Sequence, residues 1–212
     1  MVTGVARFTK LWVASFFLSA RGLVAIGLLV AGVMAPAGAA AGPARPGLPA
    51  VLIPDGATPY LRTRAVGTQN YVCVATGAGL AWKFVGPQAT LFVHVFGVEQ
   101  QATTHFLSPN PDEANLARAT WQGSLDSSRV WARATQIVDD PAVIGTGNIP
   151  WLLLQRAGSR RGPTGGALVS QATWIQRVHT VGGVAPAAGC SESTHAGATA
   201  LVPYSTDYVF LR

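Results

Sequence analysis

Five polar side chains could carry chemistry in this chain: His94, His105, Asp126, Arg177 and His179. His94 and His105 lie on successive strand-like runs, so a hairpin could bring both imidazoles within reach of one metal ion. With a nearby carboxylate, the pair would suit a small metal-dependent or acid–base hydrolase. The spacing matches no defined metal motif, however, so one histidine packed among aromatic residues and another on a solvated strand is the simpler interpretation.

The other three side chains have equally open interpretations. Asp126 lies between Trp121 and Trp131 in a serine-rich segment, where a carboxylate could bind a sugar or act as a general acid. The same composition is typical of a hairpin turn. Arg177 and His179 are two residues apart, so on a strand they would share one face, about 7 Å apart, and could hold a carboxylate or sulfate. A salt bridge to a neighbouring strand and a surface histidine would explain them as well.

Several common functional motifs are absent from the sequence. It has no Gly-x-Ser-x-Gly elbow, no phosphate-binding loop and no Gly-x-Gly-x-x-Gly after a strand, so nucleotide binding is disfavoured. No run of lysine and arginine and no nucleic-acid motif accompanies the net charge of +6, so nucleic-acid binding is not expected. We therefore predict no cofactor and no metal ion.

The N-terminal sequence predicts export. Basic residues, a long apolar run and an Ala-x-Ala tract make residues 1–41 a signal peptide, or an uncleaved anchor that would be the protein's contact with a membrane. A Pro/Ala linker, 42–49, precedes a single domain, 50–212. Without the leader the net charge falls from +6 to +3, since three basic residues and no acid leave with it.

The chain contains two cysteines, Cys73 and Cys190. In an exported protein, two cysteines most simply form one disulfide bond. The alternative, a pair of free thiols or a nucleophile, needs a partnering base, and neither cysteine has a histidine nearby in sequence. A disulfide in turn predicts a location in the cell envelope or outside the cell.

Short runs rich in Thr, Val and aromatic residues recur between Gly, Pro, Asn and Asp, which is typical of an all-β protein. We expect an antiparallel β-sandwich or barrel of about 8–10 strands with one disulfide. The best helix candidate, 111–119, would form only a short turn. The expected strands are 60–65, 70–75, 80–85, 89–96, 103–107, 117–122, 130–138, 151–155, 167–180 and 207–211.

Alternation assigns faces to two of these runs. In 89–96 the aliphatic side chains should face the core, and Phe92 and Phe96 could line a concave surface or the cavity of a barrel that binds a small apolar ligand. In 167–180, Trp174 and Val178 should point inward, with Arg177 and His179 outward.

Several segments in order carry a family resemblance. The chain resembles a family of exported bacterial and fungal proteins of unknown function, which implies a secreted β-rich domain without an established activity. Some fungal members carry a malate dehydrogenase label, which this chain does not support because it lacks a dinucleotide fingerprint. The matching segments are GTQNYVC (67–73), GPQATL (86–91), IPWLLL (149–154), IQRVHTVGG (175–183) with Cys190, and VPYSTDYVF (202–210).

These observations favour a binding or structural module of the cell envelope or extracellular space. The hydrolase that would use His94, His105 and a carboxylate is the first alternative. The barrel that binds an apolar ligand is the second. The sequence does not identify a partner.

Overall fold

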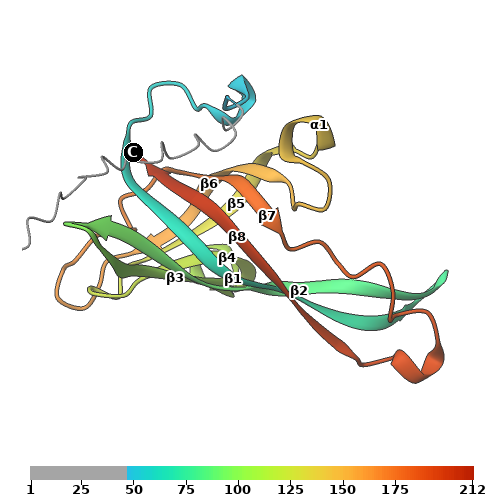
Figure 1. The fold of residues 1–212 in the computed structure, drawn as a ribbon. Helices are drawn as coiled ribbons and strands as arrows, with labels where there is room; N and C mark the ends of the chain where they lie inside the picture. The colour runs from blue at the N-terminus through green and yellow to red at the C-terminus, as the bar shows by residue number, and fades with distance from the viewer. Residues whose placement is uncertain (1–46) are drawn as a thin grey trace, which may run out of the picture. The chain divides into compact units, whose positions relative to one another are not determined.

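Eight antiparallel strands close into one barrel in the computed structural model, which describes residues 47–212 (Figure 1). Each strand pairs with the next along the chain, and β1 pairs with β8 to close the barrel. The predicted all-β antiparallel fold is confirmed, as a barrel rather than a sandwich. The predicted leader and the linker up to residue 46 lie outside the described residues. The strands are β1 (Pro59–Thr76), β2 (Gly79–Val95), β3 (Val98–Asn110), β4 (Leu116–Gly123), β5 (Arg129–Val138), β6 (Trp151–Arg160), β7 (Trp174–Gly182) and β8 (Thr199–Leu211).

The expected strands outnumber the observed ones because two pairs of runs each form one long strand. β1 joins the runs 60–65 and 70–75, and β2 joins 80–85 and 89–96. The glycines that suggest turns in the sequence lie inside these long strands. Gly67 lies where β1 and β2 approach closely, since an added Cβ would be 2.1 Å from the Gln88 carbonyl oxygen. Gly86, with φ of 144°, belongs to a β-bulge in β2.

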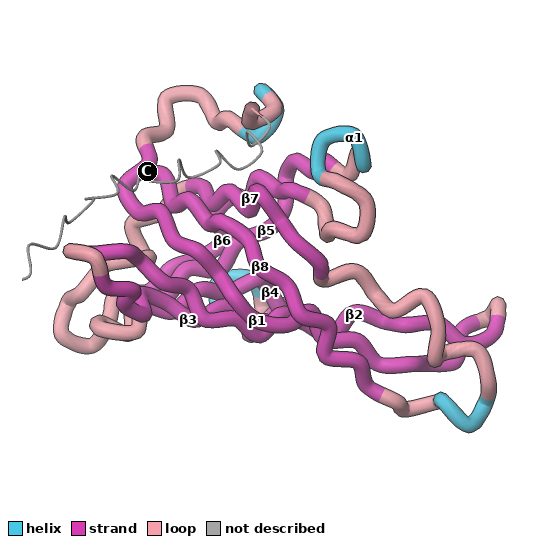
Figure 2. Tube along the Cα trace, in the orientation of Figure 1, coloured by secondary structure: helices cyan, strands magenta, loops and turns pink. Residues whose placement is uncertain are grey.

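Helical elements in residues 47–212 are short, and they lie before the first strand or in the connections between strands (Figure 2). They are the 3-10 turns η1 (Ala50–Leu52), η2 (Pro111–Glu113) and η3 (Ser193–His195), and one turn of α-helix, α1 (Pro141–Ile144). The Asn110 side chain caps η2, and the Asp140 side chain caps α1. The helix candidate 111–119 is therefore limited to η2, and its second half enters β4.

The barrel interior is filled by an aromatic and aliphatic core. Trp121, Leu91, Ile175 and Phe210 are each fully buried there, and Tyr208 is almost so. These residues come from strands on all sides of the barrel, so the interior at this level is packed rather than open.

A second apolar cluster covers the outer face of β6 and β7. Leu52 of η1 and Ile144 of α1 pack with Trp151, Leu153 and Val178. The cluster is anchored by a hydrogen bond from the Gln176 side chain to the Leu52 carbonyl oxygen, 2.7 Å. Both faces of β7 are therefore covered, one by the barrel interior and one by η1 and α1.

This second cluster explains why the predicted faces of β7 were wrong. Ile175 belongs to the barrel core, and Arg177, two residues on, lines the cavity at the barrel end. Trp174 and Val178, predicted to point inward, pack in the outer cluster. When both faces carry apolar residues, alternation does not say which face is the interior, and an offset of one residue reverses every side chain.

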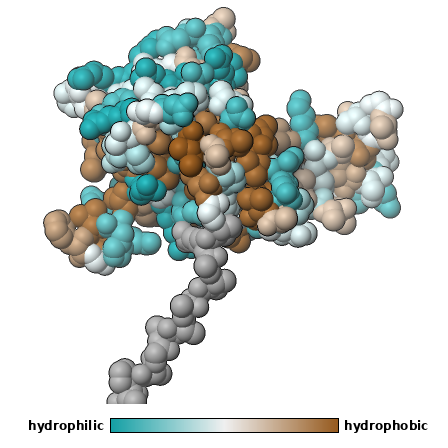
Figure 3. All heavy atoms as spheres, turned by 90° about the horizontal axis from the view of Figure 1, so that it is seen from above, coloured by the Kyte–Doolittle hydropathy of each residue, from teal (hydrophilic) through white to brown (hydrophobic). Residues whose placement is uncertain are grey.

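The predicted core face of 89–96 is correct for only half of the run. Ala89 and Leu91 are buried in the barrel, but the pairing of β2 with β3 shifts after Leu91. Val95 is 40% exposed and Phe96 is fully exposed in the hairpin turn, with φ of 49°. Phe96 therefore lines no cavity. Apolar side chains also reach the surface elsewhere, as Figure 3 shows for one face.

The far ends of β1 and β2, with the start of β8, extend beyond the barrel as a three-stranded arm (Figure 1). The predicted Cys73–Cys190 disulfide is confirmed and ties this arm to the loop between β7 and β8, with a Cα–Cα distance of 5.5 Å. Trp82 adds a hydrogen bond to the Ala188 carbonyl oxygen in the same loop. The disulfide is compatible with an extracellular or periplasmic location. Within residues 47–212, no helix is both long and apolar enough to cross a bilayer.

Candidate functional site

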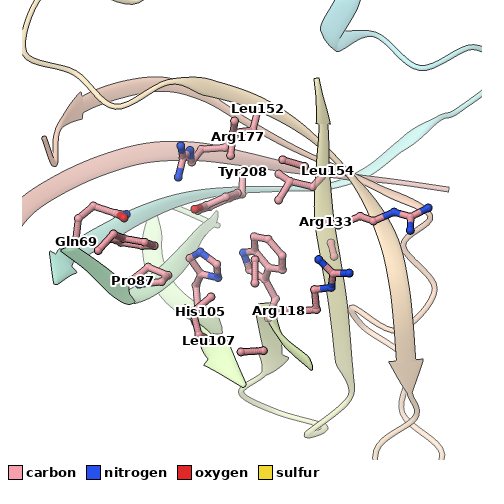
Figure 4. Close-up of a pocket in the computed structure, with 16 residues that line it drawn as sticks. Gln69, Pro87, His105, Leu107, Arg118, Arg133, Leu152, Leu154, Arg177 and Tyr208 are labelled. Atoms are coloured by element: carbon pink, nitrogen blue, oxygen red, sulfur yellow. The ribbon is translucent and has the colours of Figure 1, made fainter. Parts of the chain in front are cut away.

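The barrel opens at one end because neighbouring strands stop pairing there. The β2–β3 ladder begins at Ala89 and His105, so the preceding part of β2 leaves β3 and enters the arm. The β4–β5 ladder begins at Ala119 and Ala132. Between these separations lies a cavity of about 380 Å³, within the range of small-molecule sites (Figure 4). Its apolar wall is formed mainly by Phe84, Pro87, Leu107, Leu152 and Leu154.

An aromatic group forms the inner end of this cavity. The His105 ring stacks on Trp121, with ring centroids 4.2 Å apart and planes 9° apart. Tyr208 meets both rings edge-on, at 5.2 Å from His105 and 5.3 Å from Trp121. Such pairs fix the orientation of each ring. The three side chains therefore give the cavity a rigid, preformed inner end.

His105 is a neutral side chain in this environment. Burial lowers its pKa to about 3, although the hydrogen bond to the Thr120 carbonyl oxygen opposes that shift. A carbonyl oxygen only accepts hydrogen bonds, so Nδ1 donates to it at 2.9 Å and carries the proton. Nε2 therefore keeps its lone pair. A histidine in this state is a packing residue and a hydrogen-bond acceptor, and it does not supply charge.

Several buried polar atoms around the cavity make no hydrogen bond of good geometry among the described residues, although Tyr204 lies close enough to Tyr208 and Gln69, and Tyr208 to Arg177, for weaker hydrogen bonds to act on the tyrosine pKa values. These atoms include Gln69 Nε2, Trp121 Nε1 and the Tyr208 hydroxyl, all on residues that line the cavity, and the Tyr204 hydroxyl in the adjoining core. Buried polar groups in folded proteins are nearly always paired, and an unpaired one destabilises by about 1–3 kcal/mol. Four such atoms at one barrel end can be satisfied by water or by a bound molecule that enters the cavity.

Three arginines and no acidic residue line the cavity. Arg118 forms an ion pair with Glu113, 2.6 Å, which lowers the pKa of that carboxyl to about 2. Arg133 is exposed at the rim and has a long contact, 3.4 Å, with the Gln155 amide oxygen. Arg177 is half-buried and donates from Nε and Nη2 to the Pro150 carbonyl oxygen. Among the described residues no carboxylate pairs with Arg177, so its charge is uncompensated.

Arg177 lies at the centre of the buried polar group. Figure 4 shows its guanidinium on the same side of the cavity as the Tyr208 hydroxyl and the Gln69 amide, with Arg118 and Arg133 on the other side. Its charge lowers the pKa of Tyr208 and Tyr204, although burial, the larger effect, leaves both raised. The arrangement combines an apolar wall, a rigid aromatic end and one half-buried cation, Arg177, that no carboxylate of the described residues neutralises.

The structure separates the histidines that the sequence grouped together. His105 faces Ala89 across the β2–β3 ladder, whereas His94 faces Glu99 near the hairpin turn, five residues further along β2 or roughly 17 Å. His94 is exposed. Among the described residues no cluster of three or more His, Cys, Asp or Glu could hold a metal ion. The hydrolase hypothesis therefore has no assembled site in this part of the chain.

Asp126 has a structural role in a loop. Its carboxylate accepts hydrogen bonds from Leu168 N and from both the backbone N and the hydroxyl of Ser128. Burial raises the pKa of Asp126, but these hydrogen bonds outweigh burial and the net pKa is lowered. The carboxylate is thus held ionised, which is the wrong state for a general acid at neutral pH.

Arg177 and His179 do not share a face, because the β7–β8 ladder is irregular between Val178 and Val181. His179 adopts a φ of 54° there and turns to the outside of the barrel. Its Nδ1 lies 2.9 Å from the Asp207 carboxylate and its ring meets Trp151 edge-on. It borders an outer groove that also includes Phe92 and His94, so Phe92 does not line the barrel cavity. The predicted joint site for a carboxylate or sulfate is therefore not formed by this pair.

Sequence reasoning missed Gln69, Trp121, Leu152 and Tyr208 as residues of the site. The sequence of β8 could have identified Tyr208 as an inward-facing residue. Every second residue there shares one face, and that face is mostly aromatic: Tyr204, Thr206, Tyr208 and Phe210. Which strand ends meet at the opening depends on the bulges and on strand separation, which a single sequence does not show.

The comparisons with known proteins give one match. A comparison with curated proteins finds no match, and a comparison with solved structures finds none either. One family model, described as "Protein of unknown function (DUF3455)", matches residues 54–212, which include every strand of the barrel and the whole of the cavity. The chain therefore belongs to the DUF3455 family of proteins of unknown function.

Proposed function

We propose that this domain is an exported binding module that holds one small, largely apolar molecule in the open end of its barrel. The observation that carries the proposal is the cavity itself: about 380 Å³, with an apolar wall and three lining residues whose buried polar atoms make no hydrogen bond of good geometry among the described residues. Apolar walls with a few convergent polar groups are typical of small-molecule sites. Export is supported by the leader sequence and by the disulfide.

The aromatic inner end supports binding rather than catalysis. His105, the one histidine that lines the cavity, is neutral, stacked and hydrogen-bonded to backbone. Within residues 47–212, no carboxylate lines the cavity to pair with it as an acid or base. Preformed walls lower the entropy lost when a ligand binds, which favours a carrier or sensor of small molecules.

A neutral fluorescent probe tests the proposal. N-phenyl-1-naphthylamine becomes bright in an apolar cavity, so titration should give a saturable signal with one site per chain. Ala134→Trp, at the exposed rim of the cavity on β5, should fill the opening and abolish that signal. Gln136→Trp is the matched control, because Gln136 faces Leu153 of the outer cluster and does not line the cavity. Equal signals from both variants, or no saturable signal from the unmodified protein, would refute the proposal.

A further inference from the structure

We propose that the barrel site selects ligands that carry a carboxylate, and that Arg177 binds this carboxylate. The inference rests on the binding function proposed above and adds the chemical class of the ligand. Three observations support a carboxylate: the hydrogen bonds that Arg177 makes, the positive charge of the cavity wall, and the buried hydrogen-bond donors that lie in the cavity.

The guanidinium of Arg177 donates to a backbone carbonyl oxygen along one edge only. Nε and Nη2 donate to the same acceptor, the Pro150 carbonyl oxygen, at 3.1 and 2.8 Å. A guanidinium carries five N–H donors in a planar fork. Arg177 also acts on the Tyr208 hydroxyl through a hydrogen bond that lowers the pKa of Tyr208. The edge formed by Nη1 and the second Nη2 hydrogen donates to no carbonyl or carboxylate of the described residues, and it matches the two oxygens of a carboxylate in a bidentate pair. The bond to Pro150 holds the fork in place before a ligand arrives.

The charge of the cavity also favours an anion. Arg177 is half-buried and has no carboxylate partner among the described residues, whereas Arg118 is neutralised by Glu113. Arg133 is exposed, so its charge is solvated. A half-buried cation without a counter-charge is destabilised by partial loss of water, and a bound anion relieves that penalty. One uncompensated guanidinium balances one negative charge, which a carboxylate carries and a phosphate dianion exceeds.

The unpaired atoms are chiefly donors. Trp121 Nε1 and Gln69 Nε2 only donate, and the Tyr208 hydroxyl can donate. Arg177 lies near the Tyr208 hydroxyl, and Figure 4 shows the Gln69 amide on the same side of the cavity. A group with several lone pairs satisfies such a set, and a carboxylate has about four acceptor positions. The apolar body of the ligand would then lie against Leu152 and Leu154 and the rest of the apolar wall.

A matched pair of ligands tests the inference by isothermal titration calorimetry. 2-Naphthoate and 2-naphthamide have the same ring system and nearly the same shape, and only the first is an anion. We expect 2-naphthoate to bind about tenfold to a hundredfold more tightly, as a charged, bidentate hydrogen bond implies. Arg177→Gln should remove this preference by weakening 2-naphthoate much more than 2-naphthamide, and the binding of 2-naphthamide that remains shows that the variant has a folded cavity.

Two further variants sharpen the result. Arg177→Lys keeps the charge but not the fork, and it should recover only part of the preference. Arg129→Gln is the control, because Arg129 is exposed, contacts Gln122 and does not line the cavity, and the preference should persist. If both ligands bind equally well and Arg177→Gln changes neither affinity, the inference fails while the binding function stands. If neither ligand binds, the binding function itself fails.

Discussion

The neutral state of His105 gives a quantitative prediction for acid stability. Its pKa is lowered from 6.5 to about 3 because the ring is fully buried against Trp121 and receives no compensating negative charge. In the unfolded chain the ring has its ordinary pKa, so below pH 6.5 the unfolded state binds a proton that the folded state does not. The free energy of unfolding therefore falls as the pH decreases from 6.5 toward 3, and above pH 6.5 the ring contributes no pH dependence.

The magnitude follows from proton linkage. One proton bound only by the unfolded state lowers the free energy of unfolding by about 1.4 kcal/mol per pH unit. Between pH 6.5, where the unfolded ring is half protonated, and pH 4.5 this amounts to about 2 kcal/mol. His105→Gln removes the titrating ring while its amide can still donate to the Thr120 carbonyl oxygen. The unmodified protein should lose about 2 kcal/mol more than this variant over those two pH units.

Urea denaturation at a series of pH values measures both proteins. The difference between their slopes isolates His105, since carboxylates such as Asp126 and Glu113 titrate in both. His94→Gln is the matched control because His94 is exposed on the β2–β3 hairpin. Parallel pH dependences for the unmodified protein and His105→Gln would refute the reasoning. So would an NMR titration in which the His105 ring gains its proton near pH 6.5.

Three further predictions concern stability. Replacing Cys73 and Cys190 together by serine opens a loop with a sequence separation of 117 residues and should lower the free energy of unfolding by up to about 5 kcal/mol, seen as a lower urea midpoint. An unchanged midpoint would contradict this. Asp126→Asn should destabilise by about 1–3 kcal/mol, because an amide cannot accept all the hydrogen bonds from Leu168 and Ser128; equal melting temperatures would argue against the loop role. Gly67→Ala should destabilise by about 1–3 kcal/mol, because its Cβ would meet the β2 backbone, whereas Gly77→Ala, with nothing within 4 Å of its Cβ, should have little effect. Similar losses in the two glycine variants would show that the close approach is not the cause.

The sequence was sufficient to predict the class of fold and its covalent link. Strand-like runs between turn residues predict an all-β protein, and the two cysteines predict the bond between Cys73 and Cys190 that the structure contains. The predicted range of about 8–10 strands includes the eight observed. The sequence was not sufficient to place the strand bounds, because Gly67 and Gly86 resemble turn residues and lie within long strands. A glycine favours a turn when only its sequence neighbours are considered, but pairing with adjacent strands keeps Gly67 and Gly86 within β1 and β2.

The site was predicted only in part, for a reason of geometry. Arg177 and His105 were singled out, but each was paired with the wrong partner. His179 leaves the inner face at an irregularity in β7, and His94 lies near the opposite end of its hairpin. Bulges change which residues share a face of the sheet. Because apolar residues also cover the outer face of β7, around Trp151, the apolar residues of β7 do not alternate with polar ones in a way that identifies its inner face. The partners that the structure supplies, Trp121 and Tyr208, come from β4 and β8 and meet only when the barrel closes.

The most direct test of the binding function is the resonance of the Trp121 indole N–H in a two-dimensional NMR spectrum, assigned by loss of the peak in Trp121→Phe. This N–H is buried, lines the cavity and has no partner among the described residues. Titration with 2-naphthoate should shift the peak to saturation at one ligand per chain, together with signals of Leu152 and Leu154. A Trp121 peak that stays in place while signals of the arm or the outer groove move would contradict the account.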